Sequence, residues 1–445
     1  MEVPEHVVVG EHRSSAEPAG SGDVDRGPRV RWRPSTRSGP QLTSLADLVV
    51  RTAPAWVFLW VRAIGVLVLR WQASIDDSTL GVLLSKWDGR WMLGIALGGY
   101  DDVAPGLQDA FGHRYPETPL AFFPGYPVAV GTLRYLTGVP ALVAGLTVSL
   151  IAGVVMAHGL ARLGELVPGG SRRAGLILVA LVAAAPMGIV WSMTYSEGLF
   201  CACAVWALVA VLRREWVLAG VCTALAGTVR PTGAALLLAV GGTLLLVALR
   251  KRDGGTVAGG GADAGGGTFR AARGAGWRPW VGGMVAPLGL LGYLAYVKWH
   301  GVDAPGGWFG VQQRGWNSHF DAGAATLKFT REVLGSGRSV LEVGTVLVLA
   351  AGSVLLAICA RQAHAGTLPW PPVVYAAGVL VMDLGSNGLM NSKARLLLPA
   401  VTLLIPVAVA LGRRRTSTAA AVLVAAALLS AWFGGYALTG WSYAI

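Results

Sequence analysis

The chain has 445 residues, of which 54% are hydrophobic and only 13% are charged. A soluble globular protein carries about 25% charged residues, so the composition argues against one. Apolar runs of about 20 residues recur along the chain, which is typical of a polytopic α-helical membrane protein. The net charge is +12, but the basic residues cluster beside the ends of apolar segments, where they set orientation. Nucleic acid is therefore not an expected partner.

Residues 1–53 are polar and contain Pro, Gly and Arg, which predicts a disordered cytoplasmic tail. Residues 54–437 are expected to form one transmembrane domain of about eleven helices, with 438–445 as an outer C-terminal tail. The N-terminus is expected inside, because basic residues precede the first span. The predicted spans are 54–72, 139–161, 174–194, 197–212, 216–230, 232–249, 280–299, 339–361, 372–390, 395–412 and 418–437.

The distribution of charge supports this orientation. The dense basic clusters all fall in predicted inner loops, as the positive-inside rule requires. The predicted first outer loop, 73–120, instead has seven acidic residues against three basic ones. The inner clusters include Arg172–Arg173, Arg213–Arg214, Arg250–Arg252 and Arg413–Arg415.

Two segments need separate interpretation. Residues 121–138 are apolar enough to span, but counting them would reverse every later loop. Because Pro124 and Pro127 break the start of this segment, we expect an interfacial or re-entrant helix, which makes 73–138 one outer region. The glycine-rich stretch within 250–279 lacks the Gly-Lys-Ser/Thr ending of a phosphate loop and is expected to be a cytoplasmic linker.

Polar residues gather in the predicted outer segments. The first loop contains "KWDGRW" (86–91), and the junctions that follow contain "TYSE" (194–197) and "TVRPTG" (228–233). The last outer segments contain "QQRGW" (312–316) and "NSKAR" (391–395). Ionised groups so close to the bilayer need a partner or a wet cavity. Arg62 lies inside the first span, where a structural ion pair or snorkelling is favoured over catalysis.

These residue types suit group transfer from a lipid phosphate. A carboxylate can act as general base on a hydroxyl, and Asp88 is the first candidate, with Asp101 and Asp102 as alternatives. Basic groups can hold a phosphate and stabilise its growing charge; the candidates are Arg230, Arg314, Lys393 and Arg395. The remaining candidate substrate-binding residues are Trp87, Arg90, Trp91, Tyr195, Glu197 and Gln313.

A set of ordered blocks carries a family resemblance. "KWDGRWMLGIALGGY", "AFFPGYPVAV", "TYSEGLF", "TVRPTGAALLLAV", "QQRGW" and "SKARLLLPAVTLLIP" follow one another between about 85 and 410. In this the chain resembles the bacterial PIG-V-like mannosyltransferases, membrane glycosyltransferases of the GT-C class.

The resemblance implies an inverting enzyme of the bacterial cell membrane. Such enzymes take mannose, or another hexose, from a polyprenyl-phosphate sugar at the extracytoplasmic face. Asp88 matches the presumed base, and the basic residue of the family's R-x-x-G turn carries over to Arg230. The acceptor is expected to be a hydroxyl of a lipid or glycan. A divalent cation such as Mg²⁺ or Mn²⁺ stays an open alternative at Asp88, Asp101 and Asp102, and no metal site is identifiable from sequence.

Two other functions remain as alternatives. A transporter or flippase for a lipid-linked sugar would predict ionisable residues through the bilayer midplane and internal repeats. No convincing repeat is found, and the charges lie on one predicted face. A non-catalytic assembly scaffold would predict no coordinated set of outer acids and bases.

Overall fold

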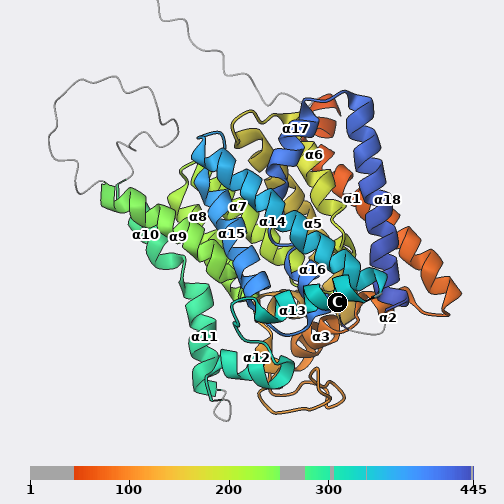
Figure 1. The fold of residues 1–445 in the computed structure, drawn as a ribbon. Helices are drawn as coiled ribbons and strands as arrows, with labels where there is room; N and C mark the ends of the chain where they lie inside the picture. The colour runs from red at the N-terminus through yellow and green to blue at the C-terminus, as the bar shows by residue number, and fades with distance from the viewer. Residues whose placement is uncertain (1–44, 251–275, 301–304, 337, 442–443, 445) are drawn as a thin grey trace, which may run out of the picture. The chain divides into compact units, whose positions relative to one another are not determined.

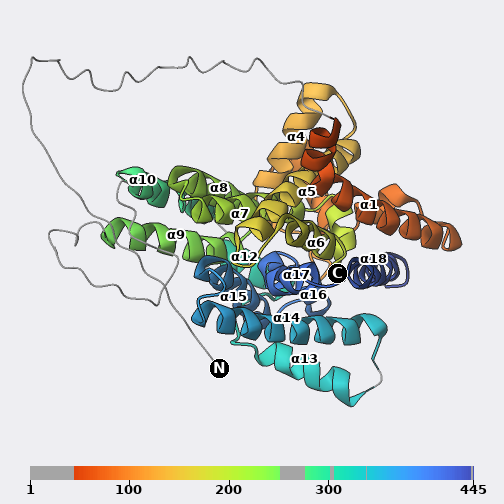
Figure 2. The same ribbon diagram turned by 90° about the horizontal axis from the view of Figure 1, so that it is seen from above.

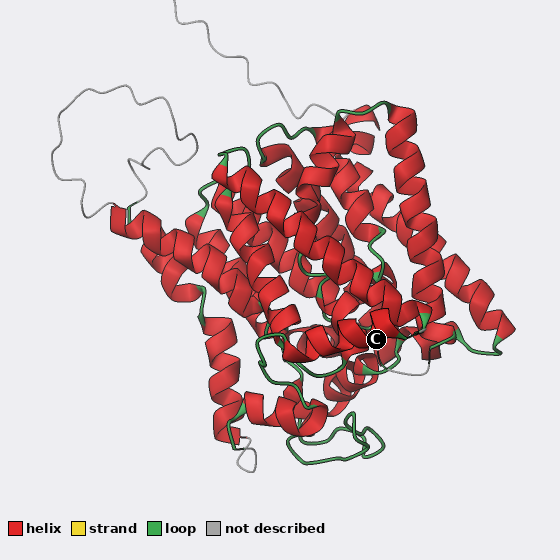
Figure 3. Cartoon of the chain, viewed as in Figure 1, coloured by secondary structure: helices red, strands yellow, loops and turns green. Residues whose placement is uncertain are grey.

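A computed structural model describes residues 45–250, 276–300, 305–336, 338–441 and 444 (Figure 1). The predicted tail 1–53 and the linker 250–279 therefore lie mostly outside the described residues. Residues Val49–Ile445 form one compact unit, and the account below concerns that unit. The described chain is helical and contains no strand; Figure 3 shows helices joined by loops, and one isolated antiparallel bridge pairs Phe320 with Ser386. The predicted all-α class is confirmed.

Five described helices are long and apolar enough to cross a membrane, which makes this a membrane protein by length and composition. Hydrophobic residues cover most sides of these helices, as expected for segments that face both lipid and protein. They are α1 (Leu45–Ile75), α5 (Ala141–Leu166), α10 with α11 (Arg278–Val285 and Leu288–His300, together Arg278–His300), α14 (Val340–His364) and α18 (Thr416–Thr439).

Four shorter apolar helices match other predicted spans. A sixth candidate span is a bent pair, Met390–Leu396 with Val401–Gly412. The total of eleven therefore stays a prediction, since five or six described segments meet the length criterion. The shorter helices are α7 (Glu197–Leu212), α8 (Trp216–Val229), α9 (Gly233–Arg250) and α15 (Trp370–Gly385).

The predicted span 174–194 is not one continuous helix in the structure. Helix α6 (Arg172–Ala183) ends early, and a 3-10 turn, η2 (Gly188–Ser192), follows Pro186. Proline has no N–H for the helix ladder, so the break begins before it. The Arg62 side chain fills this break: its Nη1 donates to the Ala183 carbonyl oxygen at 2.8 Å and its Nε to Ser192 Oγ at 3.1 Å. Arg62 is thus a structural residue, held by hydrogen bonds at a helix C-terminus instead of the expected ion pair.

The predicted span 395–412 is also broken. Its parts are α16 (Lys393–Leu396), η4 (Val401–Leu404) and α17 (Ile405–Gly412), and the two halves of the broken segment bend by 64°. Pro399 lies between α16 and η4 and removes a backbone donor there. The break leaves Lys393 and Arg395 on a short separate turn, beside another 3-10 turn, η3 (Met390–Ser392).

The predicted outer region contains short helices. Helix α4 starts immediately after Pro124, and its 13 residues reach about 20 Å, well short of the hydrocarbon core of a bilayer. An interfacial position fits this length, and Tyr135 and Leu136 are exposed on it. These elements are α2 (Leu80–Leu84), α3 (Asp88–Gly98), η1 (Thr118–Ala121) and α4 (Gly125–Thr137).

Two further short helices follow α11: α12 (Trp308–Trp316) and α13 (Ala324–Gly335). Figure 2 shows α14 and α15 side by side, with α13 along α14. Thr326 anchors α13 to the end of α15 by donating to the Leu384 carbonyl oxygen at 2.7 Å.

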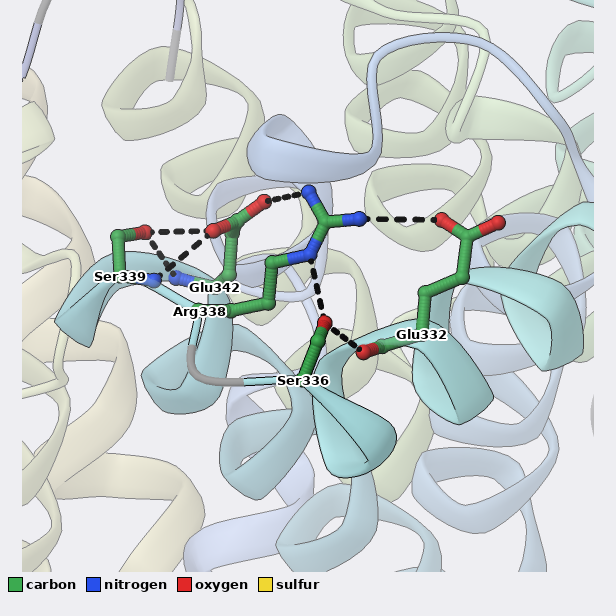
Figure 4. A network of polar contacts seen from close by, with 5 residues as sticks. All are labelled: Glu332, Ser336, Arg338, Ser339 and Glu342. Atoms are coloured by element: carbon green, nitrogen blue, oxygen red, sulfur yellow. Dashed lines mark hydrogen bonds and ion pairs between the residues drawn. The ribbon is translucent and has the colours of Figure 1, made fainter.

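The turn between α13 and α14 is held by a polar network (Figure 4). Ser339 and Glu342 form a capping box at the start of α14, which satisfies backbone N–H groups that have no helical partner. Arg338 lies 3.6 Å from both Glu332 and Glu342, which are on different helices. The pair with Glu332 is exposed, and exposed pairs are worth up to about 1 kcal/mol, so this pair adds little to stability.

The interior lies around α5, α7 and α8, where small residues let helices pack closely. Basic residues meet at one end of these helices: Arg172 donates to the Val50 carbonyl oxygen, and Arg173 to that of Arg414. The short helices α2, α3 and α12 lie at the opposite end (Figure 1). The structure therefore separates the basic loops from the loops predicted to be outer.

Candidate functional site

A cavity of about 410 Å³ opens at the end of the bundle opposite the basic loops. All five polar segments singled out in the sequence contribute to its wall. Segments more than 300 residues apart therefore converge on one site. They contribute Asp88 from the first loop, Ser196 and Arg230 from two tight junctions, Gln312 and Trp316 from α12, and Lys393 and Arg395 from α16.

Asp88 is the first residue of α3, and its backbone setting is unusual. The preceding Trp87 has φ 50° and ψ −115°, a conformation that costs a residue with a side chain of order 1–3 kcal/mol and is common near functional sites. Gly89 allows the turn to approach the 194–195 segment, because a Cβ there would lie 2.5 Å from Thr194 Oγ1. The side chain of Asp88 remains 28% exposed, and its Oδ2 lies 2.6 Å from Arg395 Nη1.

Glu197 lies behind the cavity wall and pairs with two arginines that line the cavity. Its side chain is fully buried at the start of α7, where the helix dipole favours an anion. Glu197 Oε1 lies 2.8 Å from Arg230 Nη1 and 3.6 Å from Arg395 Nε. Together with Asp88 this makes an alternating network of two carboxylates and two guanidiniums. Buried charges of this kind are tolerated only when paired.

The local sequence explains how Arg230 reaches this network. Pro231 disfavours helical geometry for the residue before it, and Arg230 is extended, with φ −152° and ψ 152°. Helix α8 ends there, and the Arg230 side chain lines the cavity while its Nη1 donates to Ser196 Oγ at 3.0 Å. Gly125 lets the "FFPGYP" block pack on this turn, since a Cβ would meet Thr228 and Val229 within 3.0 Å.

Lys393 lines the cavity but bonds mainly to backbone. Its Nζ donates to the carbonyl oxygens of Asp383 and Ser386, the latter at 2.7 Å. Both carbonyls lie at the C-terminal end of α15, where a cation is favoured. The ammonium group therefore ties α16 to α15 and adds a positive charge to the cavity.

One wall of the cavity is aromatic. Trp308 and Gln312 both donate to the Ala121 carbonyl oxygen at 3.1 Å, which fixes α12 against η1. The rings of Phe122 and Trp316 pack edge to face, with their centroids 5.6 Å apart. Trp91 lies behind this wall, stacked on Phe122 at 5.4 Å, and does not line the cavity.

Several predicted binding residues lie elsewhere. Trp87 packs against the hydrophobic core, and Lys86 lies over its ring at 5.3 Å. Arg90 and Gln313 are exposed and do not line the cavity; Gln312, one residue earlier on α12, takes that place. Arg314 pairs with Glu117 and lies over the ring of Tyr115, outside the main cavity.

Tyr195 contacts Arg395 of this network and the turn before Asp88. Arg395 lies over its ring at 5.1 Å, and its hydroxyl donates to the Lys86 carbonyl oxygen at 3.2 Å. Burial, and then the nearby Asp88 carboxylate, raise the pKa of Tyr195, so the group stays a neutral donor. Its contacts place it as a residue that positions Arg395 and the Asp88 turn.

The alternative acids do not join Asp88. Asp101 and Asp102 are exposed beyond the far end of the 11-residue helix α3, about 16 Å away along its axis. A cation shared by all three is therefore not compatible with the fold. Within the described ranges, no cluster of three or more His, Cys, Asp or Glu side chains could hold a metal ion.

Asp383 lines the cavity and was not predicted. It lies inside the apolar segment "VVYAAGVLVMDLG", and a single ionisable residue within such a segment is the signal that points to it.

Comparison with family models, curated proteins and solved structures finds no match.

Proposed function

We propose that the protein is an inverting glycosyltransferase that uses a polyprenyl-phosphate sugar, with mannose or another hexose as the transferred group. The observation that carries the proposal is the convergence of Asp88 with Arg230 and Arg395 on one cavity that also has an aromatic wall. The order of the sequence blocks supports a PIG-V-like, GT-C-class enzyme with eleven spans. We place it in a bacterial cell membrane, with the N-terminus in the cytoplasm and the cavity at the extracytoplasmic face.

In the proposed reaction, Asp88 accepts the proton of an acceptor hydroxyl on a lipid or glycan. The hydroxyl oxygen forms a bond to C1 of the sugar from the face opposite the phosphate. The bond between C1 and the phosphate oxygen breaks, and polyprenyl phosphate leaves with that electron pair. One proton moves to Asp88, and the anomeric configuration inverts.

The basic residues would stabilise the leaving phosphate. Arg230 and Arg395 line the cavity and are already held in place by Glu197, so little reorganisation is needed when negative charge develops. Arg395 also bonds Asp88, which places the base beside the phosphate-binding group. Arg314, tied to Glu117 outside this cavity, has no direct part in the proposed reaction.

The cavity also suits a lipid-linked donor. Leu290 and Leu294 of α11 and the exposed Phe309 of α12 line its apolar part, and other apolar side chains on α9 and α11 face outward. A prenyl chain in the bilayer would raise the local donor concentration and orient its phosphate, which removes part of the entropic barrier.

The test is transfer by the purified full chain in proteoliposomes. The liposomes contain polyprenyl-phosphate-[¹⁴C]mannose and membrane lipid extract, and labelled products are separated by chromatography. We expect label in a new lipid or glycan and release of polyprenyl phosphate. A flippase would instead move the intact donor between leaflets with no product. That result would contradict the proposed glycosyltransferase activity and favour the transporter alternative.

A further inference from the structure

Asp383 is a buried carboxyl group with no hydrogen-bond partner among the described residues. Its residue is 4% exposed, and neither carboxylate oxygen accepts a hydrogen bond from any residue that the structure describes. Lys393 donates to the Asp383 backbone carbonyl oxygen and not to its carboxylate. Leaving such a group without a donor costs free energy, so a buried carboxyl usually has one.

The face of α15 that carries Asp383 is the face toward the cavity. Val379, Met382, Asp383 and Ser386 all line it, at helical positions i, i+3, i+4 and i+7. This spacing places the four side chains on one stripe of the helix. Asp383 therefore belongs to the cavity wall.

A second unpartnered group lies on the same wall. Ser392 is 3% exposed, lines the cavity, and its Oγ has no hydrogen-bond partner among the described residues. Its segment, η3, leads directly into α16, which carries the basic residues. Two residues of the same cavity wall thus carry three oxygen atoms that have no hydrogen-bond partner among the described residues.

Hydrogen bonds join the two segments of the adjoining wall. Asn387 N–H donates to the His319 carbonyl oxygen at 2.9 Å, and His319 N–H donates to Asn387 Oδ1 at 2.8 Å. The Asp321 N–H also donates to the Gly385 carbonyl oxygen at 2.8 Å. These bonds hold His319 and Phe320 at the cavity, so the wall offers an aromatic ring beside polar groups.

We propose that Asp383, with Ser392, binds the vicinal diol of the transferred sugar. Two adjacent hydroxyl groups can donate to the two carboxylate oxygens of one aspartate, which matches the unpartnered pair. Ser392 Oγ supplies a further hydrogen bond, and Phe320 packs against the sugar ring. This inference rests on the proposed function, because it concerns the sugar of the proposed polyprenyl-phosphate donor.

The experiment compares two ligands on the purified full chain in nanodiscs. Polyprenyl-phosphate-mannose carries the sugar, and polyprenyl phosphate does not. The variants are Asp383→Asn, which keeps the side-chain shape, Ser392→Ala, and the control Asp77→Asn. Asp77 is exposed outside the cavity and has a positive φ that asparagine tolerates. Equilibrium binding of each ligand is measured with and without EDTA.

We expect Asp383→Asn to weaken donor binding about tenfold or more, since hydrogen bonds to charged groups are the strong ones. Binding of polyprenyl phosphate should change less than about twofold, which also shows that the variant is folded. Ser392→Ala should have a smaller effect in the same direction. Mannose donors that lack either diol hydroxyl should bind Asp383→Asn and wild type with nearly equal affinity, because the interaction has already been removed.

Other outcomes overturn the inference. Equal weakening of both ligands by Asp383→Asn would mean a general structural role, and an effect on acceptor KM alone would assign the residue to the acceptor. An Asp383 effect abolished by EDTA would make it a cation ligand. If wild type transfers mannose and Asp383→Asn matches it, this inference alone fails. If wild type binds neither ligand, the proposed function fails as well.

Discussion

Asp88 lines the cavity from the start of α3, and Asp383 lines it from the last turn of α15. Asp88 forms an ion pair with Arg395 and keeps 28% of its side chain exposed. Asp383 is 4% exposed and forms no ion pair in the part of the chain that the structure describes. The difference separates two tasks. A carboxylate beside arginines and solvent suits proton transfer next to a phosphate, whereas an unpartnered buried carboxyl suits the recognition of hydroxyl groups.

The largest expected effect is on transfer by Asp88→Asn. An amide cannot accept the proton, and general bases contribute about 10²–10⁴-fold to rate. We therefore expect the transfer rate to fall at least about a hundredfold, with donor binding less affected. The measurement is the initial rate with saturating polyprenyl-phosphate-[¹⁴C]mannose. Asp77→Asn is the matched control in the same loop, and a rate for Asp88→Asn equal to that control would reject Asp88 as the base.

The second effect is on stability, through Glu197→Gln. Removing this carboxylate leaves Arg230 and Arg395 with less compensation in a buried setting, and breaking buried ion pairs costs about 3–5 kcal/mol. The midpoint of thermal unfolding in detergent should fall by several degrees.

Glu165→Gln provides the comparison at the opposite end of the bundle. The Arg162–Glu165 pair is largely exposed, and exposed pairs contribute about 0–1 kcal/mol. We expect little change in its unfolding midpoint. Equal shifts for the two variants would contradict the supporting role given to Glu197.

The smallest effects test which arginines belong to the site. Arg230 lines the cavity, so Arg230→Gln should lower transfer about tenfold to a hundredfold. Arg314 is tied to Glu117 outside the cavity, so Arg314→Gln should lower it less than about threefold. Initial rates across donor concentrations separate the two. The reverse order would restore Arg314 as a phosphate-binding residue and weaken the present assignment.

Local pattern was sufficient for the helical class and for many helix positions. The predicted segment 197–212 coincides with α7, because unbroken apolar sequence follows Glu197 up to the arginines at 213–214. It was insufficient at Pro186 and Pro399, where hydropathy continued across breaks in the helices. Average hydropathy does not register the loss of one backbone donor, but the helix ladder does.

The direction of side chains was the second property that the sequence pattern did not predict. Gln312 and Gln313 are equivalent in composition, yet a step of one residue turns a helix by about 100°, and only Gln312 faces the cavity. Arg314 has the residue type of a phosphate ligand, but it pairs with Glu117 outside the cavity. Asp383 was not predicted, although its place inside an apolar segment is visible in the sequence; its lack of hydrogen-bond partners among the described residues is visible only in the structure.

The sequence by itself determined a helical membrane protein with basic loops separated from acidic ones, because hydropathy and charge are properties of each segment alone. It also determined that five polar segments stand at the ends of apolar ones on the same predicted side. Only the tertiary structure decided that these segments share one cavity, that Glu197 links Arg230 to Arg395, and that Arg62 closes a broken helix. Those facts depend on contacts between residues up to about 300 positions apart, which local pattern does not encode.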